Sequence, residues 1–112
     1  MKIDVTFRNM ESTEGLQDYV EKYTEKFKKY LAKYDPLATF VHVVLDGHLE
    51  HRRYTAEVRV KTPHFNLIVN RQNHDMYPLI DEIMHIMERD LQIAKEKEVD
   101  MVKKRKKISE IE

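Results

Sequence analysis

The strongest constraint on the fold is the strict alternation of polar and apolar residues between Arg53 and Lys61. The apolar positions are Tyr54, Ala56, Val58 and Val60. Successive side chains of a β-strand point to opposite faces, so this pattern predicts a strand with one buried face. Such a face needs a second layer of structure to cover it, and the rest of the chain must supply that layer.

Three further segments are predicted to be strands. Lys2 to Arg8 alternates in the same way, whereas Thr39 to Leu45 is rich in Val and Phe and is expected to be more fully buried. Asp46-Gly47 is predicted to begin a turn after that strand. Thr62-Pro63-His64 is expected to turn the chain back into a last strand, Phe65 to Val69.

Between the first two strands, apolar residues recur every three or four positions, which predicts an amphipathic helix. Ser12 or Thr13 can cap its start, and Asp35-Pro36 stops it after about Lys33. The expected apolar stripe consists of Leu16, Tyr19, Val20, Tyr23, Phe27, Tyr30, Leu31 and Tyr34.

A second helix is predicted to start near Asp75, with Asn73 or Asp75 as its cap and Pro78 in its first turn. Its expected buried stripe consists of Ile80, Ile83, Met84, Met87, Leu91 and Ala94. Apolar residues become sparse after Lys95, so the helix is expected to fray beyond that point.

The order of elements predicts an α+β fold, namely a β-α-β-β-β-α two-layer sandwich. Its four-stranded mixed sheet has both helices on one face, with the first two strands parallel if they are adjacent. Residues 1–97 are expected to form the single folded domain, and residues 98–112 a basic tail that is frayed or disordered.

Composition removes several functional classes. The chain of 112 residues has no cysteine, which excludes disulfides and thiolate chemistry, and no apolar run long enough to span a membrane. Its start lacks a signal peptide, so a cytoplasmic location is expected. Nucleotide-binding, metalloprotease and serine-hydrolase motifs are absent, so we expect no enzyme, cofactor or small-molecule substrate. His48 and His51 flank Glu50, but a solvated loop is favoured there over a metal site.

Charge is balanced overall, with 20 basic and 20 acidic residues, but it is unevenly distributed. Lys22, Lys26, Lys29 and Lys33 fall on one side of the first helix, and Lys103 to Lys107 are five consecutive cations. Rows of lysine can follow phosphates. The alternative is a solvated face in which acids pair with lysines four residues away, as the spacing of Asp18–Lys22 and Glu25–Lys29 allows.

Two motifs make the chain resemble the ribosome hibernation-promoting factor family, which includes the ribosome-associated inhibitor and was once labelled sigma-54 modulation protein. The first is Thr13-Glu14-Gly15-Leu16 through Tyr19-Val20. The second is Asp75-Met76-Tyr77-Pro78-Leu79-Ile80-Asp81, followed by Glu88-Arg89, Leu91, Lys95 and Lys97. The match covers most of the chain, which looks like the short type or an isolated N-terminal domain.

The resemblance implies a translation inhibitor of dormancy or stress that binds the small ribosomal subunit and its 16S ribosomal RNA. Members occupy the places of messenger and transfer RNA near the decoding channel, anchored by basic residues of both helices. The candidate RNA-binding residues are Lys22, Lys26, Lys29, Lys33, Arg89, Lys95, Lys97, Lys103, Lys104 and Arg105.

Departures from the family pattern motivate an alternative. Phe7 stands where the family usually has Gly, Tyr23 where it commonly has Lys, and Asp90 where Gln is frequent. Ile86, Gln92 and Ile93 occupy positions that are often basic. The same fold could therefore serve as a protein-interaction module without RNA, or as a homo-oligomer formed through Ile86 and Ile93.

Overall fold

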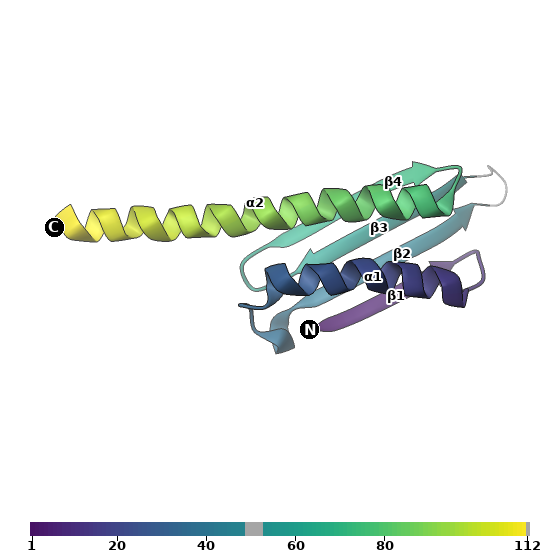
Figure 1. Cartoon of the computed structure of the whole chain (residues 1–112), viewed down its shortest axis with the longest axis horizontal. Helices are drawn as coiled ribbons and strands as arrows, with labels where there is room; N and C mark the ends of the chain where they lie inside the picture. Colours follow the sequence, from purple (N-terminus) through teal and green to yellow (C-terminus); the bar gives the residue numbers. More distant parts are fainter. Residues whose placement is uncertain (49–52, 112) are drawn as a thin grey trace.

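The computed structural model describes the backbone of residues 1–48 and 53–111, and the side chains of residues 1–47 and 53–97. The elements are β1 (Lys2–Arg8), α1 (Glu14–Leu31), a 3-10 helix η1 (Pro36–Ala38), β2 (Phe40–His48), β3 (Arg53–Lys61), β4 (Asn66–Asn73) and α2 (Met76–Ile111). The strands form one sheet in the order β1-β2-β3-β4, with β1 and β2 parallel and the other pairs antiparallel. Both helices cover the same face (Figure 1), which confirms the predicted fold class.

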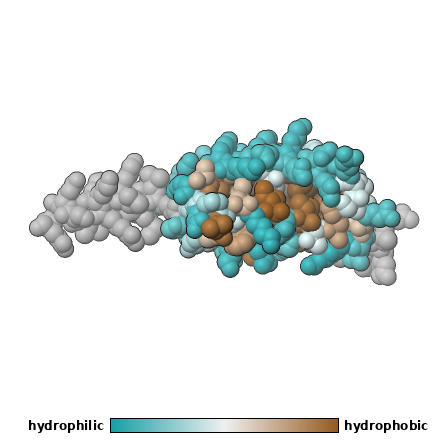
Figure 2. Space-filling model, turned by 90° about the horizontal axis from the view of Figure 1, so that it is seen from below, coloured by the Kyte–Doolittle hydropathy of each residue, from teal (hydrophilic) through white to brown (hydrophobic). Residues whose placement is uncertain are grey.

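The core lies between the helices and this covered face of the sheet. Its most deeply buried side chains come from both layers: Val20, Phe27, Val41, Val43, Leu45, Val58, Leu79, Ile80, Ile83, Met84, Met87 and Leu91. The sheet contributes alternate residues and each helix contributes one stripe, as the two periods predicted. The stripe predicted for the second helix is confirmed through Leu91, whereas Ala94 is half-buried. Figure 2 shows the brown apolar surface largely enclosed by hydrophilic side chains in the view from below.

Local hydrogen bonds explain where several elements begin. Thr13 caps α1, because its Oγ1 accepts a hydrogen bond from the Leu16 backbone N–H at 3.1 Å. The turn predicted at Thr62-Pro63-His64 is confirmed, and the backbone N–H of Thr62 donates to the Phe65 carbonyl at 2.9 Å. Pro78 lies in the first turn of α2, where a missing N–H leaves no helical bond unmade.

The turn predicted at Asp46-Gly47 is wrong. Both residues belong to β2, and Gly47 pairs with Tyr54 on β3. A Cβ on Gly47 would lie 3.1 Å from the Asn9 carbonyl oxygen and 3.2 Å from Met10 Cβ. The glycine therefore allows the connection after β1 to pass close to the strand, and the link between β2 and β3 falls in residues 49–52, outside the described part.

The second strand is more fully buried than the first, as predicted, but only one of its faces is covered. Val41, Val43 and Leu45 are buried under the helices, but Phe40 points to the uncovered face and is 43% exposed. Val44 is half-buried on that same face. The strand is thus one-sided like its neighbours, and its Val and Phe content hid the alternation.

Helix α2 is much longer than the sheet that it covers. Its 36 residues span about 54 Å, whereas the nine-residue strands β2 and β3 span about 30 Å. The C-terminal part of α2 therefore projects past the sheet (Figure 1), giving principal extents of 63 × 25 × 17 Å. The backbone is helical through Ile111, beyond the fraying expected after Lys95. That residues 98–112 form a separate tail remains a prediction.

Two kinds of feature are absent from the described residues. Neither α1 nor α2 carries, within that part of the chain, an apolar stretch suited to crossing a bilayer. No three His, Asp or Glu side chains there gather closely enough to hold a metal ion. The side chains of His48, Glu50 and His51 lie outside the described residues.

Candidate nucleic-acid interface

Four lysines form a row on the solvent side of α1 and the turn that follows it. Lys22, Lys26 and Lys29 belong to α1, and Lys33 lies two residues past its end at Leu31. All four are exposed, and the three on α1 fall within a narrow sector because each residue advances about 100° around a helix. The row lies beside the buried stripe of the helix, so the lysine ammonium groups take no part in the packing of the core. The structure therefore places Lys22, Lys26 and Lys29 on one side of α1, as the sequence indicated, whereas Lys33, expected at the end of the helix, follows it.

Tyrosine rings accompany this lysine row. The Nζ atoms of Lys26, Lys29 and Lys33 lie 5.1, 5.0 and 5.2 Å from the ring centroids of Tyr23, Tyr30 and Tyr34. A cation within about 6 Å of an aromatic centroid is attracted by the negative face of the ring. Each ring thus biases its lysine stem toward one region while the lysine side chain stays exposed.

The tyrosines also connect the two helices. Tyr19 and Tyr23 of α1 both donate hydrogen bonds to Oδ1 of Asp81 on α2, at 2.5 Å for Tyr19. Further along both helices, the Tyr30 hydroxyl donates to Glu88 Oε1 at 3.1 Å. These bonds hold the two helices at a fixed separation beside the lysine row.

The cluster perturbs the acidity of its members. Hydrogen bonds from Tyr19 and Tyr23 stabilise the Asp81 carboxylate and lower its pKa, with His85 and Lys26 adding smaller effects in the same direction. Burial, followed by the hydrogen bond to Asp81, raises the pKa of Tyr23. The bond to Asp81 raises the pKa of Tyr19 as well. The stable form is therefore a carboxylate held by two neutral phenols.

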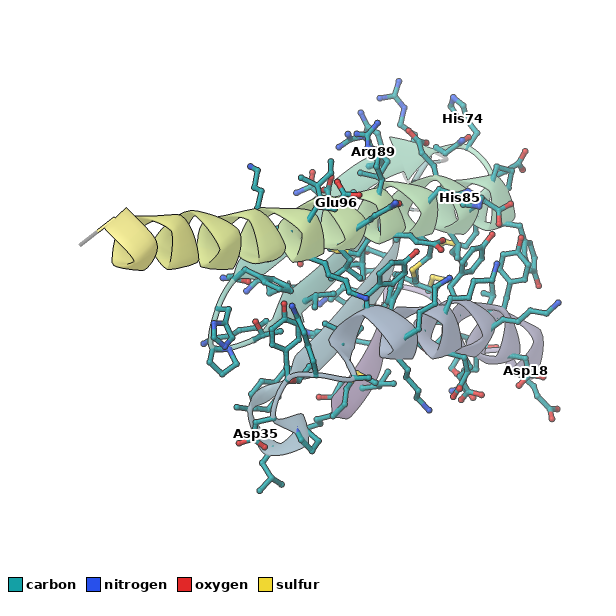
Figure 3. All side chains as sticks on the ribbon, turned by 60° about the vertical axis from the view of Figure 1, so that its left-hand side comes forward. Asp18, Asp35, His74, His85, Arg89 and Glu96 are labelled. Atoms are coloured by element: carbon teal, nitrogen blue, oxygen red, sulfur yellow. The ribbon has the colours of Figure 1, made fainter. Side chains whose placement is uncertain are left out.

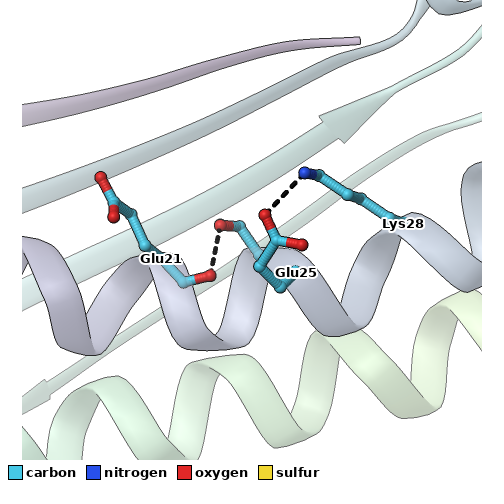
Figure 4. Close-up of polar contacts among 4 residues, drawn as sticks. Glu21, Glu25 and Lys28 are labelled. Atoms are coloured by element: carbon cyan, nitrogen blue, oxygen red, sulfur yellow. Dashed lines mark hydrogen bonds and ion pairs between the residues drawn. The ribbon is translucent and has the colours of Figure 1, made fainter.

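Carboxylates border the lysine row on both sides. Lys29 Nζ lies 3.9 Å from Glu88 Oε1 on α2. On the other side, the Lys28 ammonium pairs with the Glu25 carboxylate at 2.6 Å (Figure 4). In the same turn of α1, the Thr24 hydroxyl donates to the backbone carbonyl of Glu21 at 2.9 Å. The sequence had suggested a Glu25–Lys29 pair, but Glu25 is taken by Lys28. Lys29 is thereby left on the seam between the helices.

Of the described cations of α2, Arg89 does not join the lysine row, and Lys95 and Lys97 cannot both face it. Arg89 is exposed, and Figure 3 shows it on the side of α2 remote from α1. Lys95 and Lys97 are two residues apart, so they point about 200° from each other around the helix axis. The side chains of Lys103, Lys104 and Arg105 lie outside the described residues. The patch that the structure supports is thus the lysine row with its tyrosines.

Sequence reasoning missed the bond network around Asp81. It assigned Tyr19, Tyr23 and Tyr30 to an apolar stripe by their spacing, and their rings do pack against the core. A signal was present, because three tyrosines on one stripe bring three hydroxyls that require partners when partly buried. The partners could not be named, since they lie 58 to 62 residues away in the sequence.

Comparison with known proteins now places the chain. The family model described as Sigma 54 modulation protein / S30EA ribosomal protein matches residues 3–99. The chain therefore belongs to this family, as its two motifs predicted. Two curated relatives from Pseudomonas putida, each described as a ribosome hibernation promoting factor, are 26% identical over 102 residues, covering 91% of this chain and 94% of theirs.

Solved structures agree with this assignment. The fold is similar to that of the Thermus thermophilus Protein Y N-terminal domain, with a TM-score of 0.68 and 27% identity over 81% of this chain and 96% of that one. It is also similar to a ribosomal subunit interface protein from Coxiella burnetii, with a TM-score of 0.64 and 21% identity. That alignment covers 85% of this chain and 98% of the other, and it supports the fold.

Proposed function

We propose that this protein is a ribosome hibernation factor, not an enzyme, that binds the small ribosomal subunit and blocks messenger and transfer RNA during dormancy or stress. The observation that carries the proposal is the exposed lysine row of α1, in a chain whose relatives bear that functional name. Three cations on one helix face, with Lys33 just past its end, suit contact with successive phosphates of 16S ribosomal RNA.

The geometry favours recognition of RNA shape and backbone over recognition of sequence. The row offers ammonium groups, which bind phosphate as point charges, and phenol rings that steady the lysine stems. Asp81 and Glu88 lie at the edge of the row, and their negative charges weaken its positive potential on the side that faces α2. Phosphates would therefore approach the lysine row from the outer side of α1.

Sedimentation with purified small subunits tests this function. Lys22→Gln, Lys26→Gln and Lys29→Gln together should leave the fold intact, because all three side chains are exposed. We expect binding at least about tenfold weaker, with a salt dependence reduced by about 0.7 to 0.9 units of slope per lost contact. No comigration of the unaltered chain at low salt would refute the proposal.

A matched variant separates the row from overall charge. Lys28→Gln, Arg53→Gln and Arg71→Gln also remove three positive charges, but from outside the row. This control should sediment with subunits as the unaltered chain does. Equal losses in the two triple variants would show that general charge drives binding, and the assigned face would be wrong.

Self-association is a second candidate function. Ile93 is 41% exposed on α2, while Ile86, one of its predicted partners in an oligomer, is half-buried against the core. A single exposed isoleucine offers little apolar area for a stable dimer. Light scattering at high concentration distinguishes the cases, because a monomer would exclude this oligomer and a dimer abolished by Ile93→Lys would support it.

A further inference from the structure

The sheet face that the helices leave uncovered carries its own row of exposed side chains. Strand pairing places Lys2, Phe40, Lys61 and Asn66 directly opposite one another across β1, β2, β3 and β4. Their neighbours in sequence, among them Ile3, Val41 and Val60, point to the core. Because strand side chains alternate, the four members of this row all point away from the helices.

Phe40 has no structural role that explains its exposure. It lies in the middle of the row with 43% of its surface accessible, and a lysine stands directly opposite it on each neighbouring strand. Adjacent strands are about 4.8 Å apart, so the backbones carrying Lys2 and Lys61 are about 10 Å apart with the ring between them. A flat apolar ring between two cations matches the parts of a nucleotide strand, a base and its flanking phosphates.

The next row adds one more cation, Arg59, and one carboxylate, Asp4, to this end of the face. Arg59 is exposed and stands between His42 and Ile68, which is 47% exposed. Among the residues whose side chains are described, Lys2 and Arg59 contact carboxylates only at long range, 4.0 Å to Asp4 and 3.8 Å to Glu57. Lys61 makes no ion pair with any residue whose side chain the structure describes. Exposed pairs this long contribute little, so phosphates can compete for these cations.

We propose that this row is a second nucleic-acid site, which binds an unpaired RNA segment with one base stacked on Phe40 and phosphates on Lys2, Lys61 and Arg59. A base can reach the ring only when it is not paired and stacked in a duplex, so the site selects single strands. It lies on the opposite side of the sheet from the lysine row of α1 (Figure 1), and it extends the proposed function without depending on it.

Fluorescence anisotropy of the full chain with labelled single-stranded oligoadenylate, and with an RNA hairpin of the same length, tests the site. The single strand should bind more tightly than the hairpin. Phe40→Ala should weaken single-strand binding by about tenfold, and Phe40→Tyr should retain it, because the ring supplies the stacking. Lys2→Gln with Lys61→Gln should lower the salt slope by about 0.7 units per phosphate contact.

Leu37→Ala is the matched control, since this residue of η1 is 88% exposed and its truncation removes apolar surface without touching the row. It should bind as the unaltered chain does. Equal binding of Phe40→Ala and the unaltered chain, with both folded by circular dichroism, would overturn the proposal. So would a preference for the hairpin, or a self-association that Phe40→Ala abolishes while leaving RNA binding unchanged.

The two proposals fail separately. The triple variant of Lys22, Lys26 and Lys29 should lose subunit binding and keep its affinity for the single-stranded oligonucleotide. Phe40→Ala should show the opposite pattern, because it should lose more affinity for the oligonucleotide than for the small subunit. If the oligonucleotide binds through the helices, the triple variant will lose it and the sheet site is refuted even though the ribosomal function stands.

Discussion

Asp81 makes stability depend on pH at both ends of the scale, because its carboxylate must be charged while the tyrosines bonded to it must stay protonated. Its pKa is lowered in the folded chain, so its contribution is present above the ordinary aspartate range and disappears as pH falls through the folded value. Tyr23 has a raised pKa, so its contribution is present below the ordinary tyrosine range and disappears as pH rises through the folded value. Asp81→Asn should flatten the acid side of a stability profile measured by urea unfolding between about pH 3 and pH 7. An unchanged acid side would contradict this role.

Tyr23→Phe tests the same bond without altering charge at neutral pH. Removing the hydroxyl leaves Asp81 with Tyr19 alone and should lower the free energy of unfolding by about 1–2 kcal/mol. Tyr77→Phe is the matched control, because Tyr77 is 48% exposed and its hydroxyl makes no hydrogen bond among the described residues. It should change stability by less than about 0.5 kcal/mol. Equal effects of the two variants in chemical unfolding would show that the Asp81 bond adds nothing.

At the level of elements, the two glycines should respond oppositely to the same substitution. Gly47 lies in β2, and the Cβ of Gly47→Ala would press against the backbone of Asn9, which follows β1. This variant should lower the free energy of unfolding by about 1–2 kcal/mol. Gly15→Ala lies in the first turn of α1, where the new Cβ meets only the Tyr77 hydroxyl at 3.4 Å. It should raise stability by up to about 1 kcal/mol, since alanine favours the helix. Thermal unfolding of both variants checks the signs, and a stabilising Gly47→Ala would refute the close approach.

Elements were predictable from sequence wherever a local period was unbroken. Lys2–Arg8 and Arg53–Lys61 were found at their observed bounds because their alternation is strict. The turn predicted at Asp46-Gly47 was wrong because a single sequence does not distinguish a glycine needed for a close approach from one needed for a turn. The exposure of Phe40 was not predicted for a related reason, since composition does not reveal which face of a sheet is covered.

The candidate site also has features that the sequence predicts and features that depend on tertiary packing. The lysine row was predictable because three of its four members lie on one helix, where the helical period alone places them together. The separation of Arg89 from that row was not predictable, since it depends on how α2 is rotated against α1. The bonds from Tyr19 and Tyr23 to Asp81 depend on the same packing, and no local pattern encodes it.

On the scale of the whole molecule, the domain and the projecting end of α2 should be separable. Among the residues whose side chains the structure describes, Leu91 is the last buried one of α2, and the sheet is too short to cover the helix far beyond it. A chain ending at Lys97 should therefore unfold within about 2 °C of the full chain, because no described core side chain is removed. The deleted segment carries the five cations from Lys103 to Lys107, so subunit binding should weaken and its salt slope should fall by up to about 0.9 units per lost phosphate contact. Thermal melts and sedimentation at two salt concentrations measure the two effects independently. A shortened chain that melts much earlier would show that residues 98–112 belong to the folded domain, and unchanged sedimentation would remove the basic end from the ribosome-binding surface.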